Sequence, residues 1–395
     1  MITKVTIQAF KSLENVEVEL GNLNVFVGAN GSGKSNFLEA IGVLSAAADG
    51  RVTDRSLMQR GVRPGVPKLY KSAFASSVTR PHIRFSASSE RAGYSVSLNN
   101  PLQNPSPAWK FKNEELQRKG VRIVGRSPNT QKGLNPENGL AALAMVELAK
   151  NDPAFELMRR LQGYVIFSPA TSVLRGVSSE PEPHQPLGLS GGRLPEAVLE
   201  LLREGRKGKG AGRVTDDVLD LVDWIKEYDS APASSMPLSP AASASPQVIK
   251  FTDRHMKEGR NVLSGYDASE GALYVLFLAV LAAHPSAPVF CAVDNADHGL
   301  NPGLAKALMR SFSEWIVSNP RHRQVLITSH NPAVLDGLPL QDDRVRLFAV
   351  DRDNRGRTVV KRVVLDDQLF NMASTTGWPL SRLWMNGLIG GMPSV

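Results

Sequence analysis

The sequence has only one cysteine and no long apolar run. Cys291 has no second cysteine with which to form an internal disulfide, which is typical of proteins from a reducing cytoplasm. No uninterrupted apolar stretch approaches the ~20 residues that a transmembrane helix needs, and the first residues begin a strand pattern rather than a secretory signal. We therefore expect a cytoplasmic protein without a membrane partner.

Acidic residues are also scarce in one part of the chain. Between Arg51 and Lys132, many lysines and arginines are offset only by Asp54, Glu90, Glu114 and Glu115. The whole chain carries a formal charge of +8. A local basic excess of this kind is typical of a surface that contacts nucleic acid or an acidic protein, and an ordinary solvated surface is the alternative.

What the sequence does contain is a phosphate-binding loop. Apolar residues 25–27 run into the sequence GANGSGKS, residues 28–35, which fits G-x-x-x-x-G-K-[ST], and Phe37, Ile41 and Leu44 follow at helical spacing. Glycines let backbone N–H groups approach phosphate oxygens, while the lysine reaches the β- and γ-phosphates and the serine hydroxyl holds Mg²⁺. We expect ATP to be bound by Asn30, Gly31, Ser32, Gly33, Lys34, Ser35 and Asn36, with Ser35 also on the metal.

The order of the other elements indicates an α/β fold. Residues 2–8 and 14–20 alternate as half-buried strands do, ahead of the strand that enters the loop. Apolar runs at 289–293 and 325–327, with helical patterns at 269–283 and 303–318, predict central strands of a sheet covered on both faces. We predict a mixed, largely parallel central sheet, an N-terminal antiparallel β-layer, an edge hairpin at 345–350 and 358–364, and an inserted basic α+β lobe.

The middle of the chain is less regular. Strand-like pieces occur at 82–88, 93–98, 164–167 and 247–251, and residues 138–162 predict a helix broken at Pro153. A helix at 216–228 is expected between two linkers, the Gly-rich 204–213 and the Ser/Ala/Pro-rich 229–246. The predicted division is 1–50, the first part of the ATPase core; 51–203, the inserted lobe; 204–246, a flexible region; 247–366, the second part of the core; and 367–395, a Trp-rich tail that packs on the core or contacts a partner.

A phosphate loop near the N-terminus and an apolar strand ending in Asp294 far along the chain resemble the ATP-binding-cassette (ABC) class. The opening ITKVTIQAFKSLENVEVELGNLNVFVGANGSGKSN resembles its RecF/SMC-like branch, which includes OLD-type and related bacterial defence ATPases. The resemblance covers residues 1–45 and 262–350. It implies an ABC-type P-loop NTPase core in which Asp294 holds Mg²⁺ through water and Lys11 and Ser12 approach the nucleotide phosphates.

The resemblance also indicates where catalysis would occur. The family places a glutamate after the acidic residue, whereas this chain has Asn295, an amide that cannot take up a proton as a carboxylate does. Asp297 is the nearest substitute carboxylate, with a role in the following turn as the alternative. His330 stands where the family has a histidine that senses the γ-phosphate. Slow hydrolysis therefore remains open, because phosphoryl transfer depends mainly on positioning and charge neutralisation.

The family also needs a signature segment that binds the γ-phosphate held by the opposite subunit. Ser269 and Gly271 begin the helix that precedes the Asp294 strand, as the family requires, whereas the LSGG match at 189–192 leads into a different helix. We assign the signature to Ser269 and Gly271, which implies a homodimer with ATP between its subunits. The glutamine-bearing loop of the family stays open among Gln59, Gln103, Gln131 and Gln162.

Two functions follow as expectations. The first is an ATPase that couples nucleotide-dependent dimerisation to nucleic-acid sensing or to control of a partner effector, in anti-phage defence or DNA repair. The alternative is a hydrolysis-deficient, ATP-locked scaffold for a partner nuclease. A nucleotide-binding subunit of a transporter fits poorly, given the basic insertion and the RecF-like opening.

Overall fold

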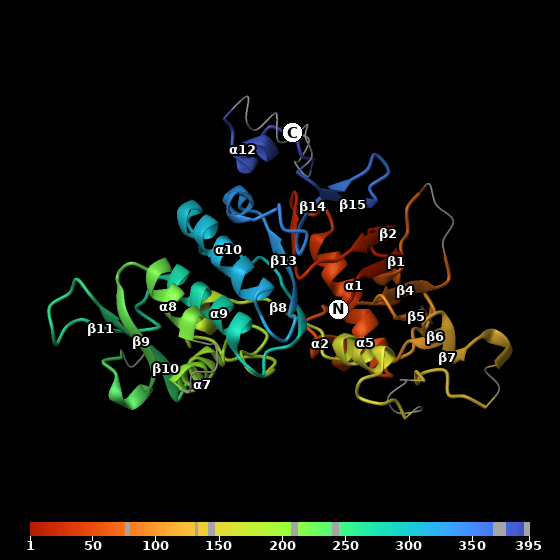
Figure 1. Cartoon of the computed structure of the whole chain (residues 1–395). Helices are drawn as coiled ribbons and strands as arrows, with labels where there is room; N and C mark the ends of the chain where they lie inside the picture. Colours follow the sequence, from red (N-terminus) through yellow and green to blue (C-terminus); the bar gives the residue numbers. More distant parts are fainter. Residues whose placement is uncertain are drawn as a thin grey trace.

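The computed structural model describes residues 1–75, 80–130, 133–140, 147–206, 212–238, 245–365 and 377–390. Within these ranges the strands form two six-stranded sheets and a three-stranded sheet, with helices between and outside them (Figure 1). No helix in the described ranges is both long enough and apolar enough to cross a lipid bilayer.

The central sheet contains the strand that enters the phosphate loop. Its order is β15 (Thr358–Val363), β14 (Val345–Arg352), β3 (Leu23–Val27), β13 (Gln324–Ser329), β12 (Phe290–Val293) and β8 (Val165–Phe167). Neighbouring strands are parallel, except that β15 runs antiparallel to β14. Because parallel strands end at one edge of a sheet, the residues that follow β3, β12 and β13 meet there.

The central sheet is covered on both faces. Along β3, Val25 and Val27 face one hydrophobic core and Phe26 faces the other. Phe26 stacks on Phe348 of β14 and packs against Phe37. This double burial explains why the central strands are apolar without alternation.

An antiparallel sheet closes one of the two cores. Its order is β2 (Leu13–Glu19), β1 (Lys4–Phe10), β4 (Ile83–Ser88), β5 (Ala92–Asn99), β6 (Lys110–Arg118) and β7 (Val121–Arg126). Helices α1 (Lys34–Ala48) and α5 (Pro153–Gln162) share this core with both sheets (Figure 1). The shorter segments here are α2 (Asp54–Met58), α3 (Pro67–Tyr70) and the 3₁₀ turn η1 (Pro128–Thr130).

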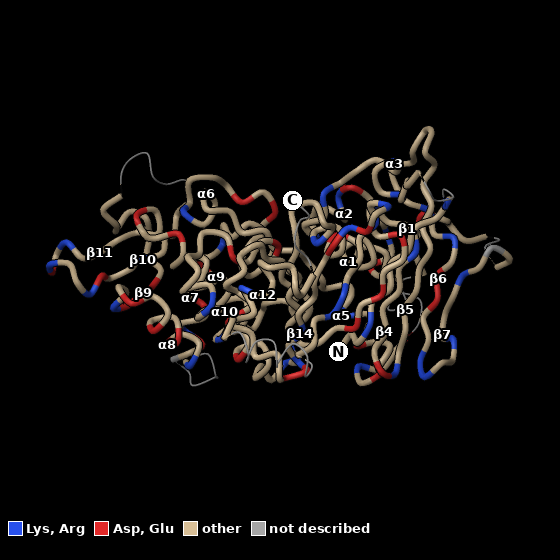
Figure 2. The backbone as a smooth tube through the Cα atoms, turned by 90° about the horizontal axis from the view of Figure 1, so that it is seen from above, with Lys and Arg blue, Asp and Glu red and all other residues tan. Residues whose placement is uncertain are grey.

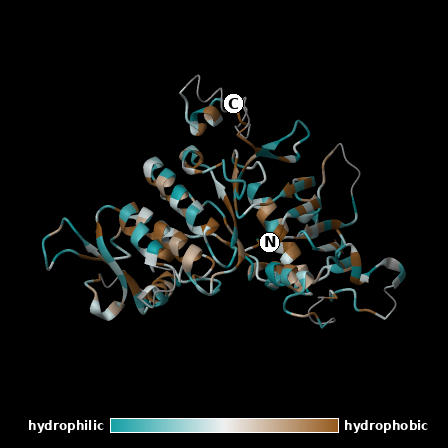
Figure 3. Ribbon diagram, in the orientation of Figure 1, coloured by the Kyte–Doolittle hydropathy of each residue, from teal (hydrophilic) through white to brown (hydrophobic). Residues whose placement is uncertain are grey.

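The other core lies on the opposite face of the central sheet. It is built on α7 (Leu194–Arg206), α8 (Gly212–Leu221), α9 (Glu270–Ala283) and α10 (Pro302–Val317). Helix α9 is buried from Gly271 to Ala282 because its neighbours enclose it, and its apolar residues are brown in Figure 3. Outside these helices lies the sheet β11 (Val262–Ser264), β10 (Gln247–Asp253) and β9 (Ile225–Pro232), followed by the turn η2 (Ala233–Ser235).

The described part of the C-terminal tail packs on the core. Helix α12 (Leu380–Met385) lies on the 3₁₀ segment η3 (Pro332–Gly337), which follows the β13 strand. Ser381 donates from its backbone N and from Oγ to the carboxylate of Asp336, at 2.9 and 2.7 Å. Leu383 and Trp384 are buried. The tail therefore takes the first of the two roles expected from its sequence.

These observations confirm the α/β fold with a mixed, largely parallel central sheet and an antiparallel N-terminal sheet. The predicted helix at 216–228 is wrong in its second half, because α8 ends at Leu221 and residues 225–232 form β9. Strand β9 pairs with β10 over residues predicted to be a linker. The Ser/Ala/Pro-rich composition from residue 229 onward concealed a strand that tertiary pairing stabilises.

Two further differences concern residues 51–203. Residues 147–152 are not helical, and α5 begins at Pro153 because Asp152 caps it by accepting from Ala154 N at 2.8 Å; residues 141–146 lie outside the described ranges. Strands β6 and β7 were not predicted, since their sequences are rich in charged residues. Strand β8 belongs to the central sheet, so the sequence between 51 and 203 contributes to the core as well as to the outer sheet.

Candidate nucleotide-binding site

The loop between β3 and α1 requires glycine at two positions. A Cβ atom on Gly28 would lie 2.2 Å from the carbonyl oxygen of Val350, and one on Gly33 would lie 2.1 Å from Thr358 Oγ1. Gly33 also has φ 113°, a conformation that other residues rarely adopt. The close approach of β14 and β15 to these glycines thus fixes the conformation in which the loop presents its N–H groups at the start of α1.

Lys34 begins α1 and lies inside the loop. Its Nζ donates to the carbonyl oxygens of Gly28, at 2.8 Å, and Ala29, at 3.0 Å, and lies 3.4 Å from Nδ1 of His330. Burial lowers the pKa of Lys34 to about 8, although the Asp294 and Asp297 carboxylates act in the opposite direction. An ammonium buried in this way is strongly attracted to an anion such as a triphosphate.

Ser35 and Asp294 lie together as a pair of oxygen ligands. Ser35 Oγ donates to Asp294 Oδ1 at 3.2 Å, and Thr328 Oγ1 donates to the same oxygen at 2.5 Å. Hydroxyl and carboxylate oxygens are the ligands that Mg²⁺ prefers, and few protein ligands suffice when phosphates and waters supply the rest. The residues present therefore fit a magnesium ion. In the described ranges no three His, Cys, Asp or Glu residues cluster as a metal site.

Asn295 follows Asp294 at the end of β12 and is exposed. Its φ of 55° lies in the left-handed region, which asparagine tolerates better than most residues, and its N–H donates to Thr328 Oγ1 at 2.8 Å. The backbone is thus held while the amide side chain points toward solvent. An amide here can orient a water molecule and cannot take up its proton.

Asp297 connects the loop after β12 to the loop after β13. Its Oδ2 accepts from the backbone N of His330 at 3.1 Å and of Asn331 at 2.7 Å. Its Oδ1 is buried and has no hydrogen-bond partner among the described residues. Burial and the nearby Lys34 charge lower the pKa of His330, so this imidazole is neutral at pH 7.

Ser12 lies against the phosphate loop, whereas the Lys11 ammonium is turned to a carboxylate. Ser12 Oγ accepts from Asn36 Nδ2 at 2.8 Å and lies 2.7 Å from Thr358 Oγ1. Lys11 forms an ion pair with the buried carboxylate of Glu39. These contacts bring Ser12 and Asn36 beside the loop, as expected, and tether Lys11 close to it.

Ser269 and Gly271 lie at the N-terminus of α9, beside the turn that follows Asp297. Ser269 is the exposed N-cap residue, and the Cβ position of the buried Gly271 lies 3.6 Å from the Gly299 carbonyl oxygen. The competing LSGG stretch wraps around Glu180 instead, because Ser190 N and Gly192 N donate to its carboxylate. Its N–H groups are therefore already engaged within the chain, which supports the choice of Ser269 and Gly271.

Comparisons with known proteins agree with this geometry. Residues 1–73 match a family described as an AAA ATPase domain, and residues 175–336 match one described as an AAA domain, putative AbiEii toxin, type IV TA system. The DNA replication and repair protein RecF of Halothermothrix orenii is 39% identical over 71 residues, which are 18% of this chain and 19% of that protein. The match thus spans less than a fifth of the relative.

The SMC head bound to the C-winged helix domain of ScpA has a similar fold, with a TM-score of 0.52 and 12% identity over 92% of this chain and 98% of that one. The SMC head domain from Thermotoga maritima gives a TM-score of 0.48 and 14% identity over 92% and 99% of the two chains. Two stretches of this chain thus resemble AAA ATPase domains, and its fold resembles that of an SMC head.

Several residues of the candidate nucleotide-binding site were not predicted. Thr328, which holds Asp294, directly precedes the predicted His330 loop, so a polar residue at a strand end was the available signal. Arg352 Nε donates to the Gly31 carbonyl oxygen at 2.9 Å, and Thr358 Oγ1 donates to that of Ser32 at 2.7 Å. Both come from the β14–β15 hairpin, and nothing in their local sequence indicates this contact.

An open hollow of ≈ 510 Å³ adjoins the phosphate loop. Five cations surround it, and they are Lys11, Arg63, Lys68, Lys71 and Arg352. Ser12, Asn36, Tyr70 and Phe74 also line it. The hollow thus joins basic and aromatic side chains beside the loop, a combination suited to a nucleotide.

None of the four candidate glutamines is assigned to the candidate nucleotide-binding site by its contacts. Gln162 donates to the Ala48 carbonyl oxygen at 3.0 Å, and Gln131 lies outside the described ranges. The loop after β8, beside the Asp294 strand, begins with Ser168 and Pro169 and holds no glutamine through residue 175.

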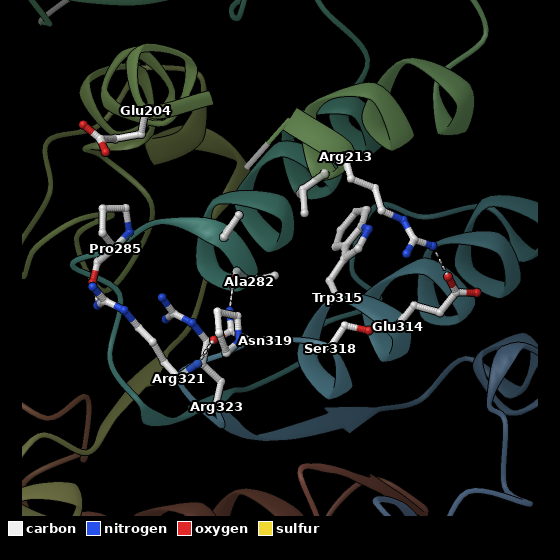
Figure 4. A pocket seen from close by; sticks show the side chains of 13 residues that line it. Glu204, Arg213, Ala282, Pro285, Glu314, Trp315, Ser318, Asn319, Arg321 and Arg323 are labelled. Atoms are coloured by element: carbon white, nitrogen blue, oxygen red, sulfur yellow. Dashed lines mark hydrogen bonds and ion pairs between the residues drawn. The ribbon is translucent and has the colours of Figure 1, made fainter. Parts of the chain in front are cut away.

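Another hollow, of ≈ 320 Å³, lies at the C-terminal ends of α9 and α10, around Arg213, Arg321 and Arg323 (Figure 4). Arg213 pairs with Glu314 at 2.6 Å, and Arg323 donates to the carbonyl oxygens of His284 and Pro288. Burial lowers the pKa of Arg323 to about 10. These arginines join the helix ends to β13 and contribute nothing to the phosphate loop.

Proposed function

We propose that this protein binds ATP with Mg²⁺, closes into a homodimer around two nucleotides and hydrolyses them slowly. The observation that carries the proposal is the pair of contacts at the start of α1, Lys34 with His330 at 3.4 Å and Ser35 with Asp294 at 3.2 Å. In the proposed complex, the base and ribose occupy the hollow beside the phosphate loop.

The residues act mainly by position and charge. Lys34 exchanges the carbonyl oxygens of Gly28 and Ala29 for β- and γ-phosphate oxygens. Ser35 and Asp294 hold Mg²⁺, which would neutralise charge that develops on the phosphates. His330 donates a hydrogen bond to the γ-phosphate, and Asp297 fixes the loop that carries it.

The site has no free carboxylate at position 295 to accept a proton from the attacking water. Asn295 orients it without accepting its proton, and Asp297 engages one carboxylate oxygen in backbone hydrogen bonds, so hydrolysis is slow. Ser269 and Gly271 complete the site from the opposite subunit, where the N-terminus of α9 attracts the γ-phosphate.

A second function is favoured by Asn295 itself. If its amide supports no useful turnover, ATP locks the dimer and the protein serves as a scaffold for a separate nuclease or other effector. This alternative predicts ATP affinity and dimerisation without measurable phosphate release.

The antiparallel sheet β4–β7 is the surface that we assign to nucleic acid. A hollow of ≈ 310 Å³ on this sheet is lined by the exposed Arg84 and Arg122, with Ser95, Ser97 and Asn113 between them. Arg126, Glu114 and Glu115 also line it, and Glu114 is buried. Figure 2 shows further lysines and arginines along this end of the molecule. Part of the basic excess is structural, however, since Arg60 pairs with Asp49 and Arg118 with Asp152.

The biological role is proposed from the names of the matched proteins. RecF is a DNA replication and repair protein, and the 175–336 match is to a family described by a putative AbiEii toxin. We infer a role in DNA repair or anti-phage defence, with cutting, where it occurs, supplied by a separate protein.

The deciding experiment is ATP turnover of the purified protein, alone and with duplex DNA or structured RNA, together with its mass in solution with and without ATP. Turnover stimulated by nucleic acid supports the sensor ATPase, and ATP-dependent dimers without turnover support the scaffold. Nucleic-acid binding should weaken steeply as salt is raised. Salt-independent binding, or none at low salt with ATP present, would contradict the basic-surface assignment, and Arg84→Ser with Arg122→Ser tests its location.

A further inference from the structure

The segment assigned to the γ-phosphate contains an acidic residue. Glu270 lies between Ser269 and Gly271 in the first turn of α9. Ser269 makes no side-chain capping bond, which leaves the N–H groups of this turn available to an anion. A freely moving carboxylate here would repel a phosphate and would compete with it for the same N–H groups.

The Glu270 carboxylate is held by two side chains from other segments. Its Oε1 accepts from the hydroxyl of Thr171 and lies 3.3 Å from Nδ1 of His298. A carboxylate at neutral pH only accepts, and the Nδ1 of His298 can act as the donor to it. Tyr274 lies 3.2 Å from the same nitrogen and donates from its hydroxyl to the Pro169 carbonyl oxygen at 2.9 Å.

Residues 169–175 therefore contact the start of α9 at three points. Besides Thr171 and Pro169, Arg175 Nη2 donates to the Ala268 carbonyl oxygen at 3.3 Å. This segment includes the short helix α6 (Thr171–Leu174). The LSGG stretch in turn contacts residues 169–175, since Ala170 N donates to the Ser190 carbonyl oxygen at 3.0 Å.

We propose that Thr171 and His298 are positioning residues that keep Glu270 away from the phosphate-binding N–H groups of the signature segment. The inference rests on the proposed function, in which Ser269 and Gly271 bind the γ-phosphate of the opposite subunit. His298 belongs to the turn after Asp294, so it also connects the signature segment to the magnesium side of the same chain.

The test is a set of variants measured by ATP-dependent dimerisation in sedimentation experiments with Mg²⁺ and a non-hydrolysable ATP analogue. Thr171→Val with His298→Ala frees the carboxylate and should weaken the dimer more than tenfold, because like charges brought together strongly oppose association. Adding Glu270→Gln to this pair should restore the dimer to within about threefold of wild type, since the free charge is removed. Glu270→Gln alone should dimerise like wild type.

The restoration separates positioning from a merely structural loss, because a damaged fold would not recover when a third residue is changed. Thr6→Val with His255→Ala is the matched control: Thr6 also faces a glutamate, Glu17, at 3.4 Å, and both residues lie away from α9. This control should not change dimerisation. In every variant, the affinity of the monomer for ATP should equal that of wild type.

Three results would overturn the inference. They are a triple variant as weak as the double variant, a double variant that dimerises normally, and a Glu270→Gln variant as defective as the double. If the wild-type protein itself binds ATP and stays monomeric, the dimer proposal fails together with this inference. The wild-type arm thus shows which of the two is wrong.

Discussion

At the scale of single residues, the buried ammonium of Lys34 makes ATP affinity depend on pH. Its pKa of about 8 in the free protein should rise when phosphates surround it, so binding above pH 8 must take up a proton. We expect Kd to be constant from pH 6.5 to 7.5 and about tenfold weaker at pH 9. Calorimetry in buffers of different ionisation enthalpy should detect proton uptake at pH 8.5. An equal Kd at pH 7 and pH 9 would contradict this.

Asn295 gives the second prediction at this scale. Asn295→Glu places a carboxylate beside the γ-phosphate and should raise ATP turnover at least tenfold, within the range of general-base effects. Its left-handed backbone should cost about 1 kcal/mol of stability in this variant. Phosphate release is the measurement, with Asn295→Asp as a shorter carboxylate and Asp294→Ala as the inactive control. A native rate that is already robust and unchanged in Asn295→Glu would reject the assigned role.

At the scale of elements, the β14–β15 hairpin supports the phosphate loop. Thr358 Oγ1 donates to the Ser32 carbonyl oxygen and lies within hydrogen-bonding distance of Ser12 Oγ, at 2.7 Å each. Thr358→Val keeps the shape and removes both bonds, which should lower stability by about 1–3 kcal/mol and weaken ATP binding severalfold. Thr358→Ser keeps the hydroxyl and should behave like wild type. Denaturant unfolding and ATP titration measure the two effects, and an unchanged Thr358→Val would show that the hairpin only covers the sheet edge.

At the scale of the whole molecule, sites shared between subunits predict complementation. Lys34→Ala removes the phosphate-loop contact, and Ser269→Arg blocks the signature segment, so each variant alone should lack closed ATP-bound dimers. A mixed dimer regains one intact site, formed by the unaltered phosphate loop of one subunit and the unaltered signature of the other. An equal mixture should recover about a quarter of wild-type sites, from half the dimers with one site of two.

The complementation experiment reads closed sites as trapped nucleotide, so it does not require turnover. Mixing Lys34→Ala with Asp294→Ala is the control, because both changes affect the same half of the site and each mixed dimer contains no intact site. Recovery in that control, or none in the first mixture, would contradict the shared-site arrangement.

The local pattern of the sequence determined a large part of this protein. Apolar runs that end in Asp294 and Thr328, and a glycine-rich turn ending in Lys34, already indicated a covered parallel sheet with a phosphate loop at its edge. Short-range signals suffice here because strand burial and loop glycines impose requirements on adjacent residues. The convergence of Lys34, Ser35, Asp294 and His330 follows, since parallel strands end at one edge of a sheet.

Tertiary structure alone decided the rest. Strands β6, β7 and β9 are polar and become strands through their pairing with neighbours, so periodicity did not reveal these three strands. Thr358 reaches Ser12 across 346 positions of the sequence, and Thr171 reaches Glu270 across 99 positions. Contacts between residues so distant in sequence depend on how layers pack, and no local pattern of the sequence encodes that packing.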